Sequence, residues 1–413
     1  MKRGSYLVVG FAINLMLGTA YAWSVVTRPL REGFGASDFE AMLPNAVALA
    51  GFAIGMVPGG RFVDRQGPRR VAMLGGALFG GGYLLASLMA ITPWPVLWLT
   101  LTYGVVVGIG IGVTYSATLA TAVRWYPDRK GLASGFVVMG FGLSALVTAP
   151  VLAALVSWVG LPGAFLLLGA VFLAGVEGLA ALLAFPPHEY VSPPPRKRSK
   201  RTWTPTMEVR TREMLRTRTF WLAWLLYALG TSAGFMVINK AQPIAEQLGG
   251  ASGAMALATV QLLAVFNCLG RPAFGRVSDR YGPRETAELM SVVLLFGLAL
   301  LATSGPGPAL YVGIGIVGLV FGGFLAVMPS LASYFFGDAN LGQNYGLIFT
   351  GYGLGSVVAL FSIGPLRDAF GSYVPAFWLG MGFAAAALAI SLLLRPPPRA
   401  AARVPSVRAA ARG

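Results

Sequence analysis

Apolar runs of 18 to 28 residues recur along the whole sequence and limit what this chain can fold into. As a helix, each run is long enough to cross the ~30 Å hydrocarbon core of a bilayer. Of the 413 residues, 56% are hydrophobic and only 11% are charged, which differs strongly from the composition of soluble domains. The sequence therefore predicts an all-α membrane protein and excludes a soluble one.

Twelve transmembrane helices are predicted from these runs. We place them at residues 6–28, 38–60, 70–91, 95–122, 129–156, 161–185, 218–245, 252–276, 284–304, 308–335, 341–365 and 371–394. The first run is longer than the apolar region of a signal peptide, and no small-residue cleavage pattern follows it. We therefore expect it to be retained in the mature protein.

A basic, Pro-rich stretch at residues 186–217 separates the runs into two groups of six. It predicts a cytoplasmic linker between a bundle at 1–185 and a bundle at 218–394, and residues 395–413 predict a disordered tail. A solvated linker is favoured over a lipid-binding or regulatory segment. Of the 31 Lys and Arg residues, 26 lie at the two ends, in the linker and in alternate loops. By the positive-inside rule, both termini are then cytoplasmic, and we expect a multi-pass protein of a bacterial inner (plasma) membrane.

The net charge of +16 does not predict nucleic-acid binding, because the positive residues lie between apolar runs. Anionic lipid headgroups of the bilayer are the expected counter-charge. Cys268 is the single cysteine and lies inside an apolar run, so one chain offers neither a disulfide nor a thiolate metal site. No metal ligand set or nucleotide-binding loop is visible, so we expect no cofactor and energy supplied by gradients.

Two internal repeats relate the halves of the sequence. Residues 60–69 (GRFVDRQGPR) recur as residues 275–284 (GRVSDRYGPR) at an offset of 215, and residues 140–143 (GFGL) recur as residues 351–354 (GYGL) at an offset of 211. Parallel repeats of this kind predict two pseudo-symmetric six-helix bundles with a substrate site between them, as in rocker-switch transporters.

The repeated Gly-x-x-x-Asp-Arg-x-Gly-x-Arg element resembles the cytoplasmic loop signature of the major facilitator superfamily. Its glycines permit a tight turn, and Asp64 or Asp279 can pair with an arginine or with a helix N-terminus. We therefore predict gating loops formed by Asp64 with Arg65 and by Asp279 with Arg280. Loops that serve only to orient the chain in the membrane are the weaker alternative.

Ionisable residues inside a span are costly and thus indicate function, and Arg271 is one of two that lie well inside. It precedes Asp279 by eight residues, or ~12 Å at 1.5 Å per residue, and Asn267 lies on the same helix face. By the same arithmetic, Tyr115 lies ~13 Å from Arg124 at the end of its span. We predict that Arg271, Asn267 and Tyr115 share one layer, where a guanidinium, an amide and a phenol would bind a carboxylate.

Glu177, in the sixth span, is the other ionisable residue at such depth. Proton coupling through Glu177 or Arg271 is one interpretation. A packing role for Glu177, or an ion pair between it and Arg271, is the alternative, and packing or pairing is favoured because the sixth helix of this fold is usually peripheral.

Several segments together resemble the oxalate/formate antiporter family, which is akin to the proton-linked monocarboxylate transporters. They are residues 14–25 (NLMLGTAYAWSV), 220–227 (FWLAWLLY), 344–346 (NYG) and 351–353 (GYG), and Asn267 with Arg271. The resemblance implies transport of a small carboxylate, with Arg271 as the anion ligand and with Asn267 and Tyr115 lining the site. Tyr21, Phe324 and Tyr352 complete the candidate substrate-binding residues.

The eleventh span departs from the oxalate carriers of that family, which place a lysine there. This chain has Tyr352 in that neighbourhood and no cation in the span. Because one central cation balances one carboxylate better than two, we favour a monocarboxylate such as lactate, pyruvate or formate over oxalate. We expect proton symport by a functional monomer, with exchange or uniport as alternatives.

A membrane enzyme and a channel or receptor are the competing classes of function. His188, the single histidine, lies in the linker, and no G-x-S-x-G, H-E-x-x-H or C-x-x-C motif occurs. No pair of carboxylates lies within the spans for acid–base catalysis. Two repeated halves with gating loops fit alternating access better than a static pore.

Overall fold

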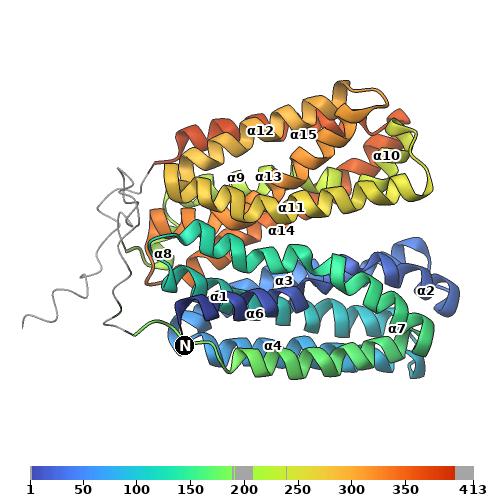
Figure 1. Ribbon diagram of the computed structural model, residues 1–413, viewed down its shortest axis with the longest axis horizontal. Helices are drawn as coiled ribbons and strands as arrows, with labels where there is room; N and C mark the ends of the chain where they lie inside the picture. The colour runs from blue at the N-terminus through green and yellow to red at the C-terminus, as the bar shows by residue number, and fades with distance from the viewer. Residues whose placement is uncertain (1, 188–189, 191–207, 239, 396–413) are drawn as a thin grey trace, which may run out of the picture. The chain divides into compact units, whose positions relative to one another are not determined.

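The computed structural model describes residues 2–187, 190, 208–238 and 240–395. These residues form helices and no strands (Figure 1). The predicted all-α architecture is thus confirmed. Most of the predicted linker (residues 188–189 and 191–207) and nearly all of the predicted tail (396–413) lie outside the described residues.

The chain divides into two compact units. Unit 1 comprises Met1–Tyr126 and Phe136–Val191, and unit 2 comprises Pro127–Gly135 and Ser192–Gly413. The elements before the linker are α1 (Arg3–Leu17), η1 (Gly18–Ala22), α2 (Ser24–Phe34), α3 (Asp38–Gln66), α4 (Pro68–Ala86), η2 (Ser87–Ile91), α5 (Pro95–Leu99), η3 (Thr100–Val107), α6 (Gly108–Trp125) and α7 (Lys130–Ala180). After the linker follow α8 (Thr211–Met214), α9 (Arg218–Ile238), α10 (Ala241–Gly249), α11 (Gly253–Tyr281), α12 (Pro283–Thr303), α13 (Pro308–Phe336), α14 (Leu341–Phe370) and α15 (Val374–Leu393).

Eleven helices among the described residues are long and apolar enough to cross a membrane. One of them, α7, has 51 residues and is interrupted at Gly160, whose φ of 71° and ψ of 174° are not helical. Pro162 lies two residues further on, where its fixed φ suits the first turn of a new helix. Since α7 thus contains the fifth and sixth spans, the eleven helices of the described residues account for twelve spans.

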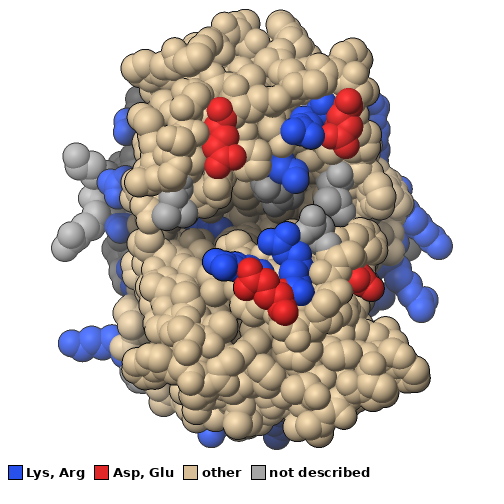
Figure 2. All heavy atoms as spheres, turned by 90° about the vertical axis from the view of Figure 1, so that its right-hand side faces the viewer, with Lys and Arg blue, Asp and Glu red and all other residues tan. Residues whose placement is uncertain are grey.

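Large apolar side chains cover much of the surface of both units. Trp158 is 81% exposed, and Phe39 and Phe361 are each 74% exposed. Many exposed large apolar side chains are costly in water and expected in contact with lipid. Figure 2, which faces the right-hand side of Figure 1, shows few charged side chains among many uncharged ones on that face. Helix α1 begins at the other end of unit 1 (Figure 1).

Equivalent helices pack against each other in the two units. In unit 1, α6 packs against α3 and α4, and in unit 2, α13 packs against α11 and α12. The α11–α13 crossing is backbone to backbone, because a Cβ added to Gly270 would lie 1.9 Å from the Leu319 carbonyl oxygen. Small residues permit such approach between membrane helices, and this contact fixes the position of α11.

Both copies of the repeated loop element reverse the chain in the same way. Gly67 and Gly282 have φ values of 82° and 111°, which an L side chain rarely adopts. Pro68 and Pro283 follow and open α4 and α12, where the missing N–H costs nothing. The glycine and proline of the element therefore form a tight turn between consecutive spans.

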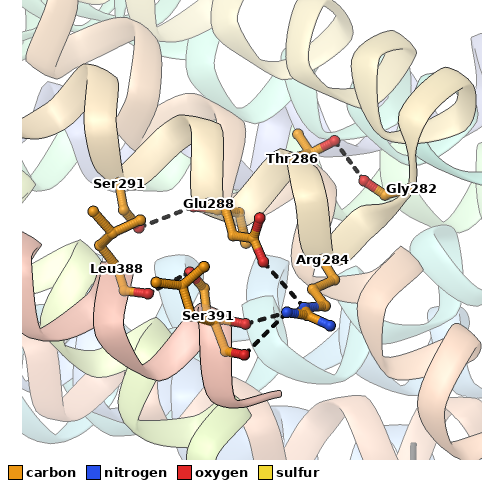
Figure 3. Close-up of polar contacts among 9 residues, drawn as sticks. Gly282, Arg284, Thr286, Glu288, Ser291, Leu388 and Ser391 are labelled. Carbon is orange, nitrogen blue, oxygen red and sulfur yellow. Dashed lines mark hydrogen bonds and ion pairs between the residues drawn. The ribbon is translucent and has the colours of Figure 1, made fainter. Parts of the chain in front are cut away.

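The last residue of the element differs between the copies. Arg284 donates to Glu288 Oε1 (3.0 Å) and to the carbonyl oxygens of Ser391 (3.3 Å) and Leu392 (3.0 Å). Figure 3 shows these contacts, by which Arg284 of α12 caps the C-terminal end of α15. Its equivalent in the first copy, Arg69, is exposed.

Candidate functional site

Arg271 lies in the middle of α11 and is the largest fully buried side chain among the described residues. Its Nη2 donates to Oδ1 of Asn267, one turn earlier, over 3.0 Å, and Asn267 is only 5% exposed. The predicted placement of these two residues on one helix face is confirmed. Because the bond orients the guanidinium, its other N–H groups have a fixed direction.

The start of α7 packs against α11 at the level of Arg271. A Cβ added to Gly135 would lie 2.4 Å from the Arg271 carbonyl oxygen, and one added to Gly131 would lie 2.3 Å from that of Gly275. The two glycines stand four residues apart, the spacing of close helix crossings in membranes. Any movement of this segment of α7 therefore alters the surroundings of Arg271.

Asp279 binds the first turn of α7. Its two carboxylate oxygens accept hydrogen bonds from the backbone N–H groups of Gly131 (2.7 Å) and Leu132 (2.8 Å). The first N–H groups of a helix have no partner within the helix and carry partial positive charge, so a carboxylate stabilises them. We predicted that this aspartate pairs with an arginine or with a helix N-terminus, and the structure confirms the helix N-terminus.

Side chains of α7 add to this attachment. Lys130 Nζ contacts a carboxylate oxygen of Asp338 and donates to Ser333 Oγ (2.6 Å), which in turn donates to Asp338 (2.6 Å). Ser134 Oγ donates to the carbonyl oxygen of Ala326 over 2.8 Å. We call Lys130, Ser134, Asp279, Ser333 and Asp338 the α7 clamp.

Asp64, in the first copy of the element, has an arginine as partner. Arg124 Nη2 of α6 donates to Asp64 Oδ1 over 2.8 Å, and its guanidinium lies 4.0 Å from the centre of the Phe185 ring. The other two predicted gating residues, Arg65 and Arg280, are exposed. The pairing predicted for Asp64 is thus confirmed, whereas the gating role of these residues remains a prediction.

Tyr115 and Tyr21 belong to one aromatic cluster in unit 1. Phe52 lies 5.1 Å from Tyr115, and Phe141 lies 5.1 Å from Tyr21 and 5.9 Å from Tyr115, between ring centres. Edge-to-face pairs of this kind hold rings in fixed orientations. The sequence analysis missed Phe52 and Phe141, although Phe141 could have been found from the repeat because it occupies the same place as Tyr352.

Tyr352 and Phe324 belong to a second cluster, in unit 2. The ring of Tyr227 lies 6.0 Å from Tyr352 and 6.5 Å from Phe324, and Phe349 stacks on Tyr352 at 4.8 Å. All four side chains are fully or almost fully buried. Tyr227 and Phe349 were not predicted, although Tyr227 ends one of the segments that carry the family resemblance.

Glu177 lies within unit 1, in the second half of α7. Its Oε1 would be 2.9 Å from a Cβ added to Gly76 of α4, and this oxygen is buried without a hydrogen-bond partner among the described residues. The carboxylate therefore faces a neighbouring helix, which favours the packing interpretation over an ion pair with Arg271.

The described residues contain a buried arginine, Arg271, but no candidate metal centre. They contain no group of three or more His, Cys, Asp or Glu side chains that could hold a metal ion. Arg271 with Asn267, and each aromatic cluster, are brought together within a unit. The predicted layer that joins Tyr115 to Arg271 involves both units and remains a prediction.

Comparison with known proteins identifies the family. A sequence model of the Major Facilitator Superfamily matches residues 7–287 and 229–412. The chain is 29% identical over 372 residues to the oxalate:formate antiporter of Oxalobacter formigenes, covering 87% of this chain and 85% of that protein. It is 27% identical over 364 residues to apicoplast pyruvate carrier 1 of Toxoplasma gondii, covering 74% and 65%.

A solved structure shares the fold. The proton:xylose symporter XylE, bound to 6-bromo-6-deoxy-D-glucose, superposes with a TM-score of 0.73 at 15% identity and covers 96% of both chains. This likeness extends over the twelve spans and supports the fold, while the sequence matches extend over both halves of the chain. The chain therefore belongs to the Major Facilitator Superfamily of membrane transporters.

Proposed function

We propose that this protein carries small monocarboxylate anions, such as lactate, pyruvate or formate, together with a proton moving in the same direction. The observation that carries the proposal is the buried Arg271, oriented by Asn267 in the middle of a transmembrane helix. A buried guanidinium is costly in a membrane protein and is retained where it binds an anion or serves a proton or ion pathway. A carboxylate fits its paired N–H donors.

The number of cations favours one carboxylate per transport cycle. The charged residues of α14, Arg367 and Asp368, lie near its C-terminal end, and Arg367 is bonded to Asp368. Tyr352, in the interior of that helix, is uncharged. The similarity to a carrier named for pyruvate supports this choice.

Exchange of a dicarboxylate is the second candidate function. Its support is the similarity to a protein named oxalate:formate antiporter over most of both chains. Oxalate has two charges, so Arg271 alone would leave one of them without a cation in a medium where charge is costly. We therefore rank exchange of oxalate second.

Proton coupling is proposed from the electrical balance of the substrate. An anion that enters a cell moves against the membrane potential, and the electrical work is about 2.3 kcal/mol for each charge at 100 mV. A proton that moves with the anion cancels its charge and removes this work. Arg271 and Glu177 are the candidate coupling residues. Because Glu177 faces α4, we expect Glu177→Gln to keep gradient-driven uptake within about twofold, whereas loss of the gradient effect alone would assign it the proton.

In the proposed cycle the α7 clamp holds one state and its release permits the other. The start of α7 touches α11 at Arg271, so an anion that binds there can change the balance between the two states, provided that it binds them unequally. The protein would act as a monomer in a bacterial inner membrane. Both termini would lie in the cytoplasm, because most Lys and Arg residues lie in the segments on the side of the termini.

Uptake into proteoliposomes tests the function directly. Purified protein is offered radiolabelled lactate, pyruvate, formate or oxalate, each with and without an inward proton gradient. We expect saturable uptake of at least one monocarboxylate, stimulated by the gradient, and little uptake of oxalate. Oxalate uptake that requires internal formate and ignores the gradient would establish the second candidate instead.

A further inference from the structure

The last residues of the linker form a strap over the loop between α13 and α14. We define the strap as residues 208–214, of which Val209 and Met214 are fully buried. The Val209 N–H donates to the carbonyl oxygen of Phe336 (3.0 Å), and Asn344 Nδ2 donates to the carbonyl oxygen of Val209 (3.2 Å). Thr211 Oγ1 donates to Asn344 Oδ1 (2.8 Å). The strap is therefore attached on both sides of this loop.

Glu208 binds the backbone of that loop. Its Oε1 accepts from the N–H of Asp338 (3.1 Å), and its Oε2 accepts from the N–H of Ala339 (2.9 Å). The loop turns at Gly337, whose φ is 83°. A carboxylate that holds two successive N–H groups fixes the direction of the chain there, and so fixes where the Asp338 side chain points.

Asp338 is also a member of the α7 clamp. Its carboxylate contacts Lys130 Nζ, and the Lys130 side chain is only 11% exposed. The next residue, Gly131, donates its N–H to Asp279. The first turn of α7 thus has two attachments, one to Asp279 of α11 and one to Asp338, and the strap supports the second.

We propose that the strap sets the strength of the α7 clamp, with Glu208 as a positioning residue that acts through Asp338 and Lys130. A change that detaches the strap frees the loop, weakens the contact with Lys130 and makes release of α7 easier. The strap thereby regulates the conformational cycle. This proposal does not depend on which substrate is carried.

A cysteine reporter tests the proposal without substrate. Cys268, the single native cysteine, is replaced by alanine, and Ala133→Cys is introduced, because Ala133 is only 2% exposed, lies in the first turns of α7 and is not a member of the clamp. The rate of maleimide labelling in nanodiscs, where both faces meet water, then reports clamp opening. Glu208→Gln removes one of two bonds to the loop, and we expect labelling to be about fivefold faster.

The matched control is Glu246→Gln, the same change at an exposed carboxylate of α10, which should leave the rate unchanged. In a Lys130→Met background the second attachment is already lost, so Glu208→Gln should add nothing. Should Glu208→Gln fail to fold, Thr211→Val weakens the strap without a charge change, and the same pattern is expected.

Two results would overturn the proposal. The first is a labelling rate that neither strap variant changes. The second is an equal acceleration with and without Lys130, because the strap would then act on the fold as a whole and not through Asp338. Failure of the transport assays with an intact labelling pattern would refute the proposed function and leave the strap in place.

Discussion

The two copies of the repeated loop element share a turn but differ in what their aspartates bind. Asp64 pairs with the side chain of Arg124, a residue of the same unit that also stacks on Phe185. Asp279 instead accepts two backbone N–H groups at the start of α7. An ion pair depends on a partner side chain, whereas a helix N-terminus binds any suitably placed carboxylate.

The two aspartates thus occupy equivalent positions in the repeated element but have different hydrogen-bond partners. The second copy lies against a helix that begins in unit 2 and continues in unit 1. Its aspartate therefore holds a segment that leads into another unit. The pair of Asp64 with Arg124, in contrast, joins α3 to α6 within one unit. If the protein moves as proposed, the two aspartates have unequal effects on the motion.

The largest effect is expected from Asp279→Ala. Loss of two charge-assisted hydrogen bonds, at about 1.5–3 kcal/mol each, should increase the open population of the α7 clamp at least about 100-fold. The rate of Ala133→Cys labelling measures this population. Asp64→Ala should change this rate far less, and equal acceleration by both variants would remove the distinction between the copies.

The turn glycines should behave alike, since both copies form the same turn. Gly67→Ala and Gly282→Ala each force a side chain into a backbone conformation that costs about 1–3 kcal/mol. Thermal unfolding of the two purified variants should show similar falls in apparent Tm. A large fall for one and none for the other would mean that the turns are not equivalent.

The smallest expected effect is the difference in stability between substitutions of the last arginine in each copy of the element. Arg284→Gln removes the cap on the carbonyl groups of Ser391 and Leu392, which we expect to cost about 1 kcal/mol. Arg69→Gln, at an exposed position, should change stability by less than about 0.5 kcal/mol. Apparent Tm values of the two variants provide the comparison, and equal values would contradict it.

Much of the fold follows from the sequence because a bilayer imposes a minimum length on each span. The break between the fifth and sixth spans was predicted at residues 156–161, and Gly160 is where α7 departs from helical geometry. The pair of Arg271 and Asn267 also follows from sequence, since residues four apart share a helix face.

Partners that come from other helices were not predictable in the same way. The contact of Asp279 with Gly131, and of Glu208 with Asp338, depends on how loops distant in sequence meet. The hydropathy pattern contains no information about which of these loops contact each other. Phe141 is an exception, because the repeat relates it to Tyr352, whereas Phe52 has no such signal and its place beside Tyr115 emerges only from helix packing.

The central claim is that Arg271 binds the transported carboxylate, and lactate counterflow with Arg271→Gln and Arg276→Gln tests it most directly. Both variants remove one guanidinium from α11, but Arg276 is exposed. We expect Arg271→Gln to lower counterflow at least about 30-fold, the cost of an unpaired buried charge, and Arg276→Gln to retain it. Equal counterflow by both variants, for a substrate that the wild type exchanges, would show that Arg271 is not the anion ligand.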